Sequence, residues 1–181
     1  MKSWPVVSHL PARHRTAIGQ IVTRWAYFEW RLKQVAYKLL DVTPKQGRIA
    51  IREPRVVDYV TMLEDLMELR AIETRTSLRH FRRSLEHTEN ARDWISHGIW
   101  IQNPRTKEMR LQLTKGSWRA DPTKQKGVSR KKVPQSIPAN PKRLKNVSLV
   151  IDTLISFADE MERDIDRALA ATRSKPTEPR D

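Results

Sequence analysis

The chain contains no cysteine among its 181 residues. This absence excludes disulfide bonds, thiolate catalysis and cysteine-ligated zinc, iron–sulfur or haem sites. Histidines and carboxylates are then the only strong metal ligands that the sequence offers. The sequence also has no glycine-rich phosphate loop and no His-Glu-x-x-His motif, so it lacks two common signatures of nucleotide and zinc sites.

The sequence also has no apolar run of membrane-spanning length and no signal-peptide apolar region near Met1. We therefore expect a cytoplasmic protein that makes no use of a membrane. The length and the 38% hydrophobic content suffice for one globular domain with a core. We expect this domain to span residues 1–173 and to be followed by a flexible tail over 174–181.

Positive charge is abundant. The formal net charge is +14 and the pI is near 10.5, which favours phosphate-rich partners, with nucleic acid as the leading candidate. Basic composition without a motif also occurs in proteins that are merely kept soluble by it, so charge alone does not decide between these interpretations.

The first helix is expected from about Pro11 to Leu40, because an apolar stripe recurs there at three- and four-residue spacing. Glu29 falls on this stripe, where an unpaired carboxylate would be unfavourable. Either Glu29 lies at the edge of the stripe and reaches water, or it pairs with an arginine or histidine of another helix. The stripe consists of Ile18, Val22, Trp25, Glu29, Leu32, Ala36 and Leu39.

Four more helices are predicted. A capping box at Thr43 begins a short one, another follows Glu53-Pro54, a third spans about 76–96, and Asn140-Pro141 begins a last helix that reaches about Thr172. The last helix has a regular apolar stripe and should pack along the first. The fold class is therefore mostly α: a bundle of about four to five helices with a β-hairpin inserted before the last helix.

The hairpin is expected over residues 98–114, where the apolar period changes from helical to alternating around a turn at Asn103-Pro104. Trp100 lies on it and either stacks on unpaired bases or covers the core. Residues 115–141 are basic and turn-rich, which predicts a long loop or arm. The loop either closes over a nucleic acid or is an exposed linker. Its central basic run is Arg130, Lys131 and Lys132.

The stretch from Arg92 to His97, at the end of the fourth expected helix, concentrates groups that can do chemistry. Asp93 and His97 are four residues apart, so the carboxylate can accept a hydrogen bond from the imidazole and orient it. Arg92 lies roughly 140° around an ideal helix from His97. Gly98 can end the helix in the left-handed conformation. A guanidinium that holds phosphate and a histidine that transfers protons together suit phosphodiester chemistry.

Arg92-Asp93-Trp94-Ile95-Ser96-His97 resembles the motif of the HEPN superfamily (higher eukaryotes and prokaryotes nucleotide-binding domain), which is an arginine, a polar residue and, after a short spacer, a histidine. The long first helix, with Trp25-Ala26-Tyr27-Phe28-Glu29, is similar too. The resemblance implies an all-α domain and a metal-independent endoribonuclease without cofactor, of the kind found in toxin–antitoxin and defence systems. It also implies a homodimer with two motifs facing one cleft, and an antitoxin or other regulatory protein as a possible partner.

By this resemblance, Arg92 binds the scissile phosphate, His97 is the general acid/base, Asp93 orients His97, and Glu29 supports Arg92. The substrate is RNA, whose 2′-hydroxyl is the nucleophile. Arg82 and Arg83, on the same expected helix, and the run from Arg130 to Lys132 are candidates for binding the RNA backbone.

The alternative is a non-catalytic basic helical module that binds nucleic acid or a partner protein. In it Arg92 forms a structural ion pair with Glu29, Asp93 pairs locally and His97 only caps the helix. A third possibility is an enzyme that uses the same fold to bind nucleotides.

Overall fold

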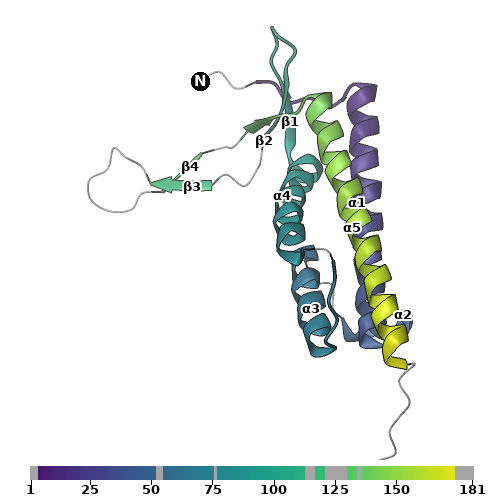
Figure 1. Cartoon of the computed structure of the whole chain (residues 1–181). Coiled ribbons are helices and arrows are strands. Elements are labelled where there is room, and N and C mark those ends of the chain that lie inside the picture. The colour runs from purple at the N-terminus through teal and green to yellow at the C-terminus, as the bar shows by residue number, and fades with distance from the viewer. Residues whose placement is uncertain are drawn as a thin grey trace, which may run out of the picture. The chain divides into compact units, whose positions relative to one another are not determined.

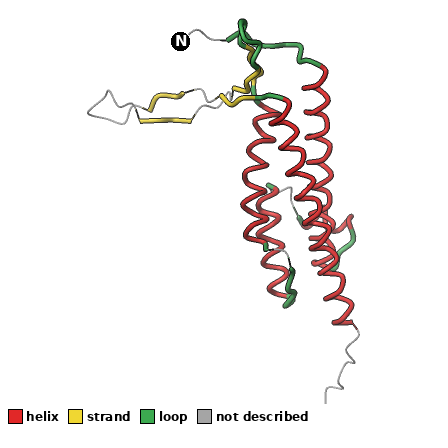
Figure 2. The backbone as a smooth tube through the Cα atoms, turned by 45° about the horizontal axis from the view of Figure 1, so that its top comes forward, coloured by secondary structure: helices red, strands yellow, loops and turns green. Residues whose placement is uncertain are grey.

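A computed structural model describes residues 4–51, 55–75, 77–112, 117–120, 130–133 and 136–173, with the backbone alone for 117–120, 130–133 and 173. Within them, no helix is long and apolar enough to cross a membrane. Figure 1 and Figure 2 show a mostly helical chain with a few strands. The elements are α1 (Ala12–Leu40), α2 (Pro44–Ala50), α3 (Val56–Leu69), α4 (Leu78–His97), β1 (Ile99–Gln102), β2 (Met109–Gln112), β3 (Ser117–Ala120), β4 (Arg130–Val133), β5 (Ser136–Pro138) and α5 (Pro141–Arg173).

The predicted fold class, a mostly α bundle with a hairpin before the last helix, is confirmed. The two predicted helix caps are present as well. Thr43 and Gln46 form the reciprocal capping box of α2, and the Asn140 side chain accepts a hydrogen bond of 2.9 Å from the backbone N–H of Arg143 in the first turn of α5. On α1 the predicted buried position Val22 is wrong: its exposed fraction is 44%, and Ile21 is buried in its place.

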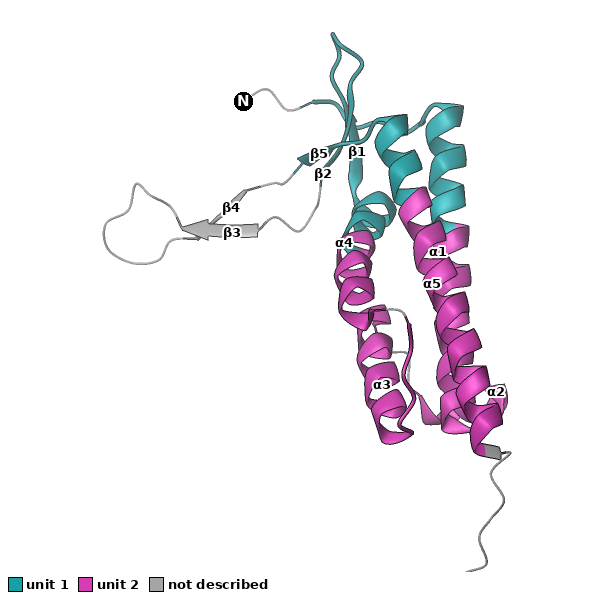
Figure 3. Cartoon of the chain, in the orientation of Figure 1, with its two compact units in different colours: residues 1–22, 90–148 teal, residues 23–89, 149–181 magenta. Residues whose placement is uncertain are grey.

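The chain forms two compact units, shown in Figure 3. Unit 1 contains Met1–Val22 and Asn90–Ser148, and unit 2 contains Thr23–Glu89 and Leu149–Asp181. Helices α1, α4 and α5 therefore contribute residues to both units.

Unit 1 is built on a three-stranded antiparallel sheet with the order β1-β2-β5. The N-terminal segment pairs with the other edge of β1, where the Val7 N–H donates to the Trp100 carbonyl at 2.8 Å and the Gln102 N–H donates to the Pro5 carbonyl at 3.1 Å. This pairing protects an edge that would otherwise be open. Trp100 is buried, which agrees with its covering the core.

The segment 115–141, predicted as a loop, contains three strands among its described residues. β3 and β4 form a separate two-stranded sheet, and β5 pairs with β2. β5 was not predicted because it contains Pro138, and proline is typical of turns and cannot donate a hydrogen bond to a sheet. It is tolerated here because β5 is an edge strand with one neighbour. The register places Ile137 opposite Leu111, so a single apolar side chain marks the strand.

Gly98 separates α4 from β1, as predicted, but not in the predicted conformation. Its φ lies outside the left-handed region. The reason for glycine is instead close packing: a Cβ at this position would lie 2.4 Å from the Trp94 carbonyl oxygen and 3.1 Å from Leu111 Cδ2. The Gly98 N–H also donates to the same Trp94 carbonyl, so the chain turns directly from the helix into the sheet.

Unit 2 is a helical core to which α1, α3, α4 and α5 contribute. Phe81 of α4 is fully buried and makes edge contacts with Phe28 of α1, at 6.0 Å between ring centroids, and with Phe157 of α5, at 6.1 Å. These aromatic contacts join three helices that are far apart in the sequence. The predicted buried face of α3 is confirmed at Val56, Tyr59, Val60, Leu63 and Met67.

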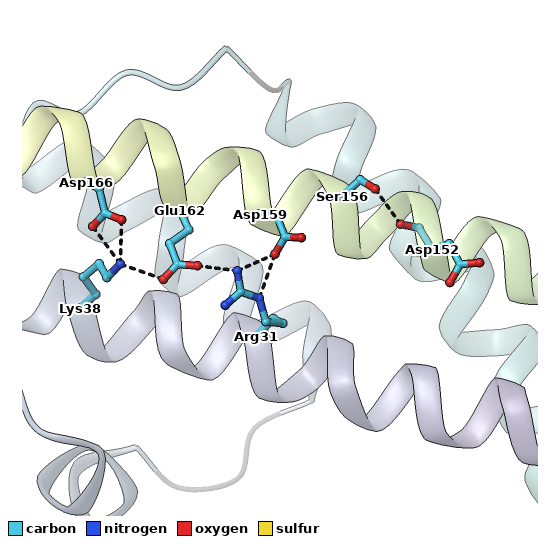
Figure 4. A network of polar contacts seen from close by, with 7 residues as sticks. All are labelled: Arg31, Lys38, Asp152, Ser156, Asp159, Glu162 and Asp166. Atoms are coloured by element: carbon cyan, nitrogen blue, oxygen red, sulfur yellow. Dashed lines mark hydrogen bonds and ion pairs between the residues drawn. The ribbon is translucent and has the colours of Figure 1, made fainter.

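Helices α1 and α5 are parallel in unit 2, and ion pairs repeat along them every seven residues. Arg24 pairs with Asp152, Arg31 with Asp159 and Lys38 with Asp166. Glu162 accepts hydrogen bonds from both Arg31 Nη2, at 2.5 Å, and Lys38 Nζ, at 2.7 Å, as Figure 4 shows. The predicted packing of the last helix along the first is therefore confirmed. The seven-residue period is that of helices packed in a coiled-coil manner.

Two glycines of the helices give a matched pair of stability predictions. A Cβ on Gly47, in α2, would lie 2.2 Å from Cδ1 of the buried Tyr37, whereas a Cβ on Gly19, in α1, would meet nothing within 4 Å. We expect Gly47→Ala to lower the free energy of unfolding by about 1 to 3 kcal/mol because Tyr37 must move. Gly19→Ala should raise it by about 1 kcal/mol. Chemical denaturation measures both, and equal effects would contradict this packing.

Candidate functional site

Arg92 and Asp93 form an ion pair near the end of α4. Arg92 Nη1 lies 2.9 Å from Asp93 Oδ1, and the exposed fractions of the two side chains are 23% and 50%. The guanidinium is thus mostly enclosed and held by a neighbouring carboxylate. An arginine fixed in this way has a defined orientation, which is a requirement for a pre-organised phosphate contact.

His97 is the last residue of α4, and its side chain is exposed. Within the described part of the chain, its ring nitrogens have neither a hydrogen bond nor an ion pair. The expected bond from His97 to Asp93 is therefore not made, because Asp93 engages Arg92 instead. The imidazole is left open to solvent and to a substrate.

Glu29, the proposed partner of Arg92, belongs to unit 2, whereas Arg92, Asp93 and His97 belong to unit 1. Glu29 is partly buried, and its Oε1 accepts a hydrogen bond of 2.6 Å from the indole N–H of Trp25, one helical turn earlier. This bond offsets part of the unfavourable desolvation of a carboxylate on the apolar stripe. The pairing of Glu29 with Arg92 stays a prediction.

The candidate RNA-binding arginines of α4 differ from each other. Arg82 is engaged by unit 2 itself, since its Nη2 donates to Glu64 Oε2 at 2.6 Å and to Thr61 Oγ1 at 2.7 Å. Arg83 is exposed and has no ion pair among the described residues. Arg83 is therefore the better candidate for a phosphate contact. Arg130, Lys131 and Lys132 lie on β4, opposite β3, and their side chains lie outside the described residues.

No group of three or more histidines, aspartates or glutamates in the described ranges is arranged to hold a metal ion. The ion pairs of the helices account for many of the carboxylates. The chemistry that this site offers through its own residues is thus a fixed guanidinium and an exposed imidazole.

Another histidine of unit 1, His14, is buried, which the sequence analysis did not predict. Its Nε2 lies 3.2 Å from the Ala139 carbonyl, its Nδ1 has no hydrogen-bond partner in the described structure, and its ring packs edge-on against Trp100. Burial lowers the pKa of His14 below its ordinary value of 6.5, and the charge of Arg13 acts in the same direction, while the bond to Ala139 opposes them. The neutral ring therefore donates its Nε2 proton to Ala139.

The lowered pKa of His14 predicts acid sensitivity. The unfolded chain takes up this proton at a higher pH than the folded protein does, so the stability is complete above about pH 6.5. It should fall as the pH drops below that value, by up to about 1.4 kcal/mol per pH unit, until the folded pKa is reached. Denaturation at pH 5 to 7.5 should show this slope, reduced in His14→Gln but kept in the control His87→Gln, which changes an exposed residue. An unchanged slope in His14→Gln would assign the acid sensitivity to other groups.

Comparison of the chain with protein-family models, with curated proteins and with solved structures finds no match of any of the three kinds. The functional argument therefore depends on the residues and their geometry.

Proposed function

We propose that the protein is a metal-independent endoribonuclease of the HEPN type. The observation that carries the proposal is the pair of cationic and imidazole groups at the end of α4. Arg92 is held by Asp93, and His97 is exposed without a partner in the described part of the chain. A guanidinium held by a carboxylate and an exposed imidazole, both in the last turns of one helix, are the minimum equipment for cleaving a phosphodiester without a metal.

In the proposed reaction, the 2′-hydroxyl of RNA attacks the adjacent phosphorus and the bond to the 5′-oxygen of the next nucleotide breaks. The products are a 2′,3′-cyclic phosphate and a 5′-hydroxyl. Arg92 stabilises the charge that develops on the phosphate oxygens. His97 moves the proton that leaves the 2′-hydroxyl or the proton that the leaving oxygen gains.

The proposal extends to the assembly. In a homodimer with two motifs at one cleft, one His97 accepts a proton while the second donates one. The net charge of +14 favours an RNA substrate, and Arg83 offers an exposed phosphate contact. A toxin or defence role, with an antitoxin or other regulatory partner, follows from the same resemblance to HEPN proteins.

The test is cleavage of single-stranded RNA by the purified protein in EDTA. We expect cleavage with a cyclic phosphate end, and no cleavage of the same sequence in 2′-deoxy form, which lacks the nucleophile. Cleavage of both substrates, or cleavage that EDTA abolishes, would contradict the mechanism. A wild-type protein that binds RNA and cuts none would instead support the non-catalytic module.

A further inference from the structure

Unit 2 contains a cavity of about 650 Å³ that lies away from the Arg92–His97 motif in the sequence. This volume is in the range of sites that bind small molecules or parts of larger ligands. It is formed where the second half of α1, the short α2 and the start of α3 meet. The lining residues are Trp30, Lys33, Gln34, Tyr37, Pro44, Arg48, Ile51 and Tyr59.

Trp30 forms an aromatic wall of the cavity, and Tyr27 extends this aromatic surface outside the cavity. The Trp30 side chain is half exposed, at 49%, and stacks on Tyr27, with 5.7 Å between ring centroids and 28° between ring planes. Tyr27 is exposed to a similar degree and does not line the cavity. The Trp30 indole N–H has no acceptor among the described residues. The two rings thus form a half-exposed stacked pair on α1, and Arg31 Cζ lies over the Trp30 ring at 5.9 Å from its centroid.

Among the described residues that line the cavity, the charged groups are the cations Lys33 and Arg48. Lys33 and Arg48 have no carboxylate partner in the described ranges, although Arg48 Nε donates to the Pro44 carbonyl at 3.3 Å. Arg31 and Lys38 on the same helix differ, because Asp159, Glu162 and Asp166 of α5 neutralise them (Figure 4). The positive charge of α1 is therefore compensated by α5 at Arg31 and Lys38, whereas no described carboxylate compensates Lys33 at the cavity.

From this combination we propose that the cavity binds unpaired nucleotides of a single-stranded nucleic acid. A base stacks on the exposed part of the Tyr27–Trp30 pair, the Gln34 amide and the indole N–H are available to base or sugar oxygens, and Lys33 and Arg48 hold phosphates. A strand fits better than a free nucleotide, because the aromatic surface extends past the cavity to Tyr27 and offers a second base a place to stack. The site is independent of the proposed cleavage reaction.

The test is binding of a fluorescent single-stranded 2′-deoxy oligonucleotide, measured by anisotropy in EDTA. This probe lacks the 2′-hydroxyl and is not cut by the proposed mechanism, so binding is measured apart from catalysis. We expect Trp30→Leu to raise the Kd about tenfold, and Trp30→Tyr, which keeps a ring, to stay within about threefold of wild type. Lys33→Glu should weaken binding and lower the slope of log K against log salt by about one.

The matched control is Lys145→Glu, which makes the same charge change at an exposed lysine of α5 in unit 1. It should weaken binding less than Lys33→Glu does. Equal effects of the two lysine variants would mean that the strand binds through the net charge of the protein and not at the cavity. Wild-type binding by Trp30→Leu would mean that no base stacks on Trp30. Either result overturns the proposal.

Two further results separate this proposal from its rivals. If mononucleotides compete as strongly as the oligonucleotide, the occupant is a free nucleotide and not a strand. If Trp30→Leu changes the molar mass in light scattering but leaves the Kd unchanged, the aromatic surface is a contact between copies of the chain. Because the 2′-deoxy probe binds without being cut, its Kd and the rate of RNA cleavage are measured separately, so a loss of cleavage and a loss of this site are distinguishable.

Discussion

His97→Ala is expected to lower the rate of RNA cleavage by about 10²- to 10⁴-fold, the usual contribution of a positioned general acid or base. His97 is exposed and has no hydrogen bond within the described structure, so the substitution should change the stability by less than about 0.5 kcal/mol. The measurement is single-turnover cleavage together with thermal denaturation. His87→Ala, which removes another exposed histidine of the same helix, is the control and should cleave at the wild-type rate.

Substitution of Arg92 should also lower the rate of RNA cleavage, because Arg92 stabilises charge on the phosphate in the proposed mechanism. Arg92→Lys keeps the charge but loses the planar fork that holds phosphate by two bonds, so we expect a large loss of kcat. Since Arg92 is mostly enclosed, circular dichroism must show that the variant folds. Exposed Arg79 of α4 gives the control Arg79→Lys. Wild-type cleavage by both the Arg92 and the His97 variants would remove the motif from catalysis and leave it a structural role.

The Arg92–Asp93 ion pair changes the role expected of Asp93. The sequence predicted that Asp93 orients His97, but in the structure its carboxylate lies 2.9 Å from Arg92. In the proposed mechanism, Asp93 therefore positions the guanidinium of Arg92. Its loss should act on phosphate binding, so Asp93→Asn is expected to raise KM more than it lowers kcat and to leave the pH profile unchanged. A shifted pH profile would restore the predicted bond to His97 in the working enzyme.

The sequence was sufficient for the helices because their apolar stripes follow the helical period over many turns. Phe81 and Leu85 of α4, and Ile151 and Leu154 of α5, are fully buried at the expected spacing. Short strands have no such redundancy. β5 has three residues and ends in proline, so its identity depends on pairing with β2, and pairing is a property of the fold and not of the local sequence.

For the site, the sequence predicted the residue types at the end of α4 but not which of them bond to each other. Asp93 is adjacent to Arg92 and four residues from His97, and local spacing permits either partner. The cavity at Trp30 was missed because its lining comes from three helices. A detectable signal was present: Tyr27 and Trp30 lie off the predicted apolar stripe of α1, where large aromatics are unusual unless they meet a ligand or partner.

The ion pairs between α1 and α5 also follow a charge pattern that is visible in the sequence. Arg24, Arg31 and Lys38 are seven residues apart, and Asp152, Asp159 and Asp166 repeat this spacing on α5. Matching periods of opposite charge predict that the two helices pack in register, and the observed pairs show that they run parallel. Apolar periodicity does not reveal this pattern, because all of its residues are charged.

These repeats lead to the largest expected change in stability, for Arg31→Glu. Arg31 donates from Nε to Asp159 at 2.8 Å and from Nη2 to Glu162 at 2.5 Å, and its side chain is 18% exposed. Burial alone would lower the pKa of Arg31, but its contacts with Asp159 and Glu162 outweigh burial and raise it, so the charged form is strongly favoured. Glutamate at this position brings a third carboxylate close to Asp159, which loses its partner, and to Glu162, which keeps only its contact with Lys38. We expect a loss of about 3 to 5 kcal/mol in the free energy of unfolding, because repulsion adds to the penalty of enclosed, unpaired charge.

A charge exchange tests whether the loss of stability comes from the lost pairing between the two helices or from the loss of the arginine itself. Arg31→Glu combined with Asp159→Arg restores an inverted pair beside Glu162, and it should recover at least half of the lost stability in chemical denaturation. Arg24→Glu is the control at the preceding repeat, where the paired side chains are 40% and 42% exposed, and it should lower the stability by less than about 1 kcal/mol. If the double variant is no more stable than Arg31→Glu alone, the contact between Arg31 and Asp159 does not set the alignment of α1 and α5. In that case the lower exposure of the Arg31–Asp159 pair, compared with the Arg24–Asp152 pair, does not explain why the two repeats contribute differently to stability.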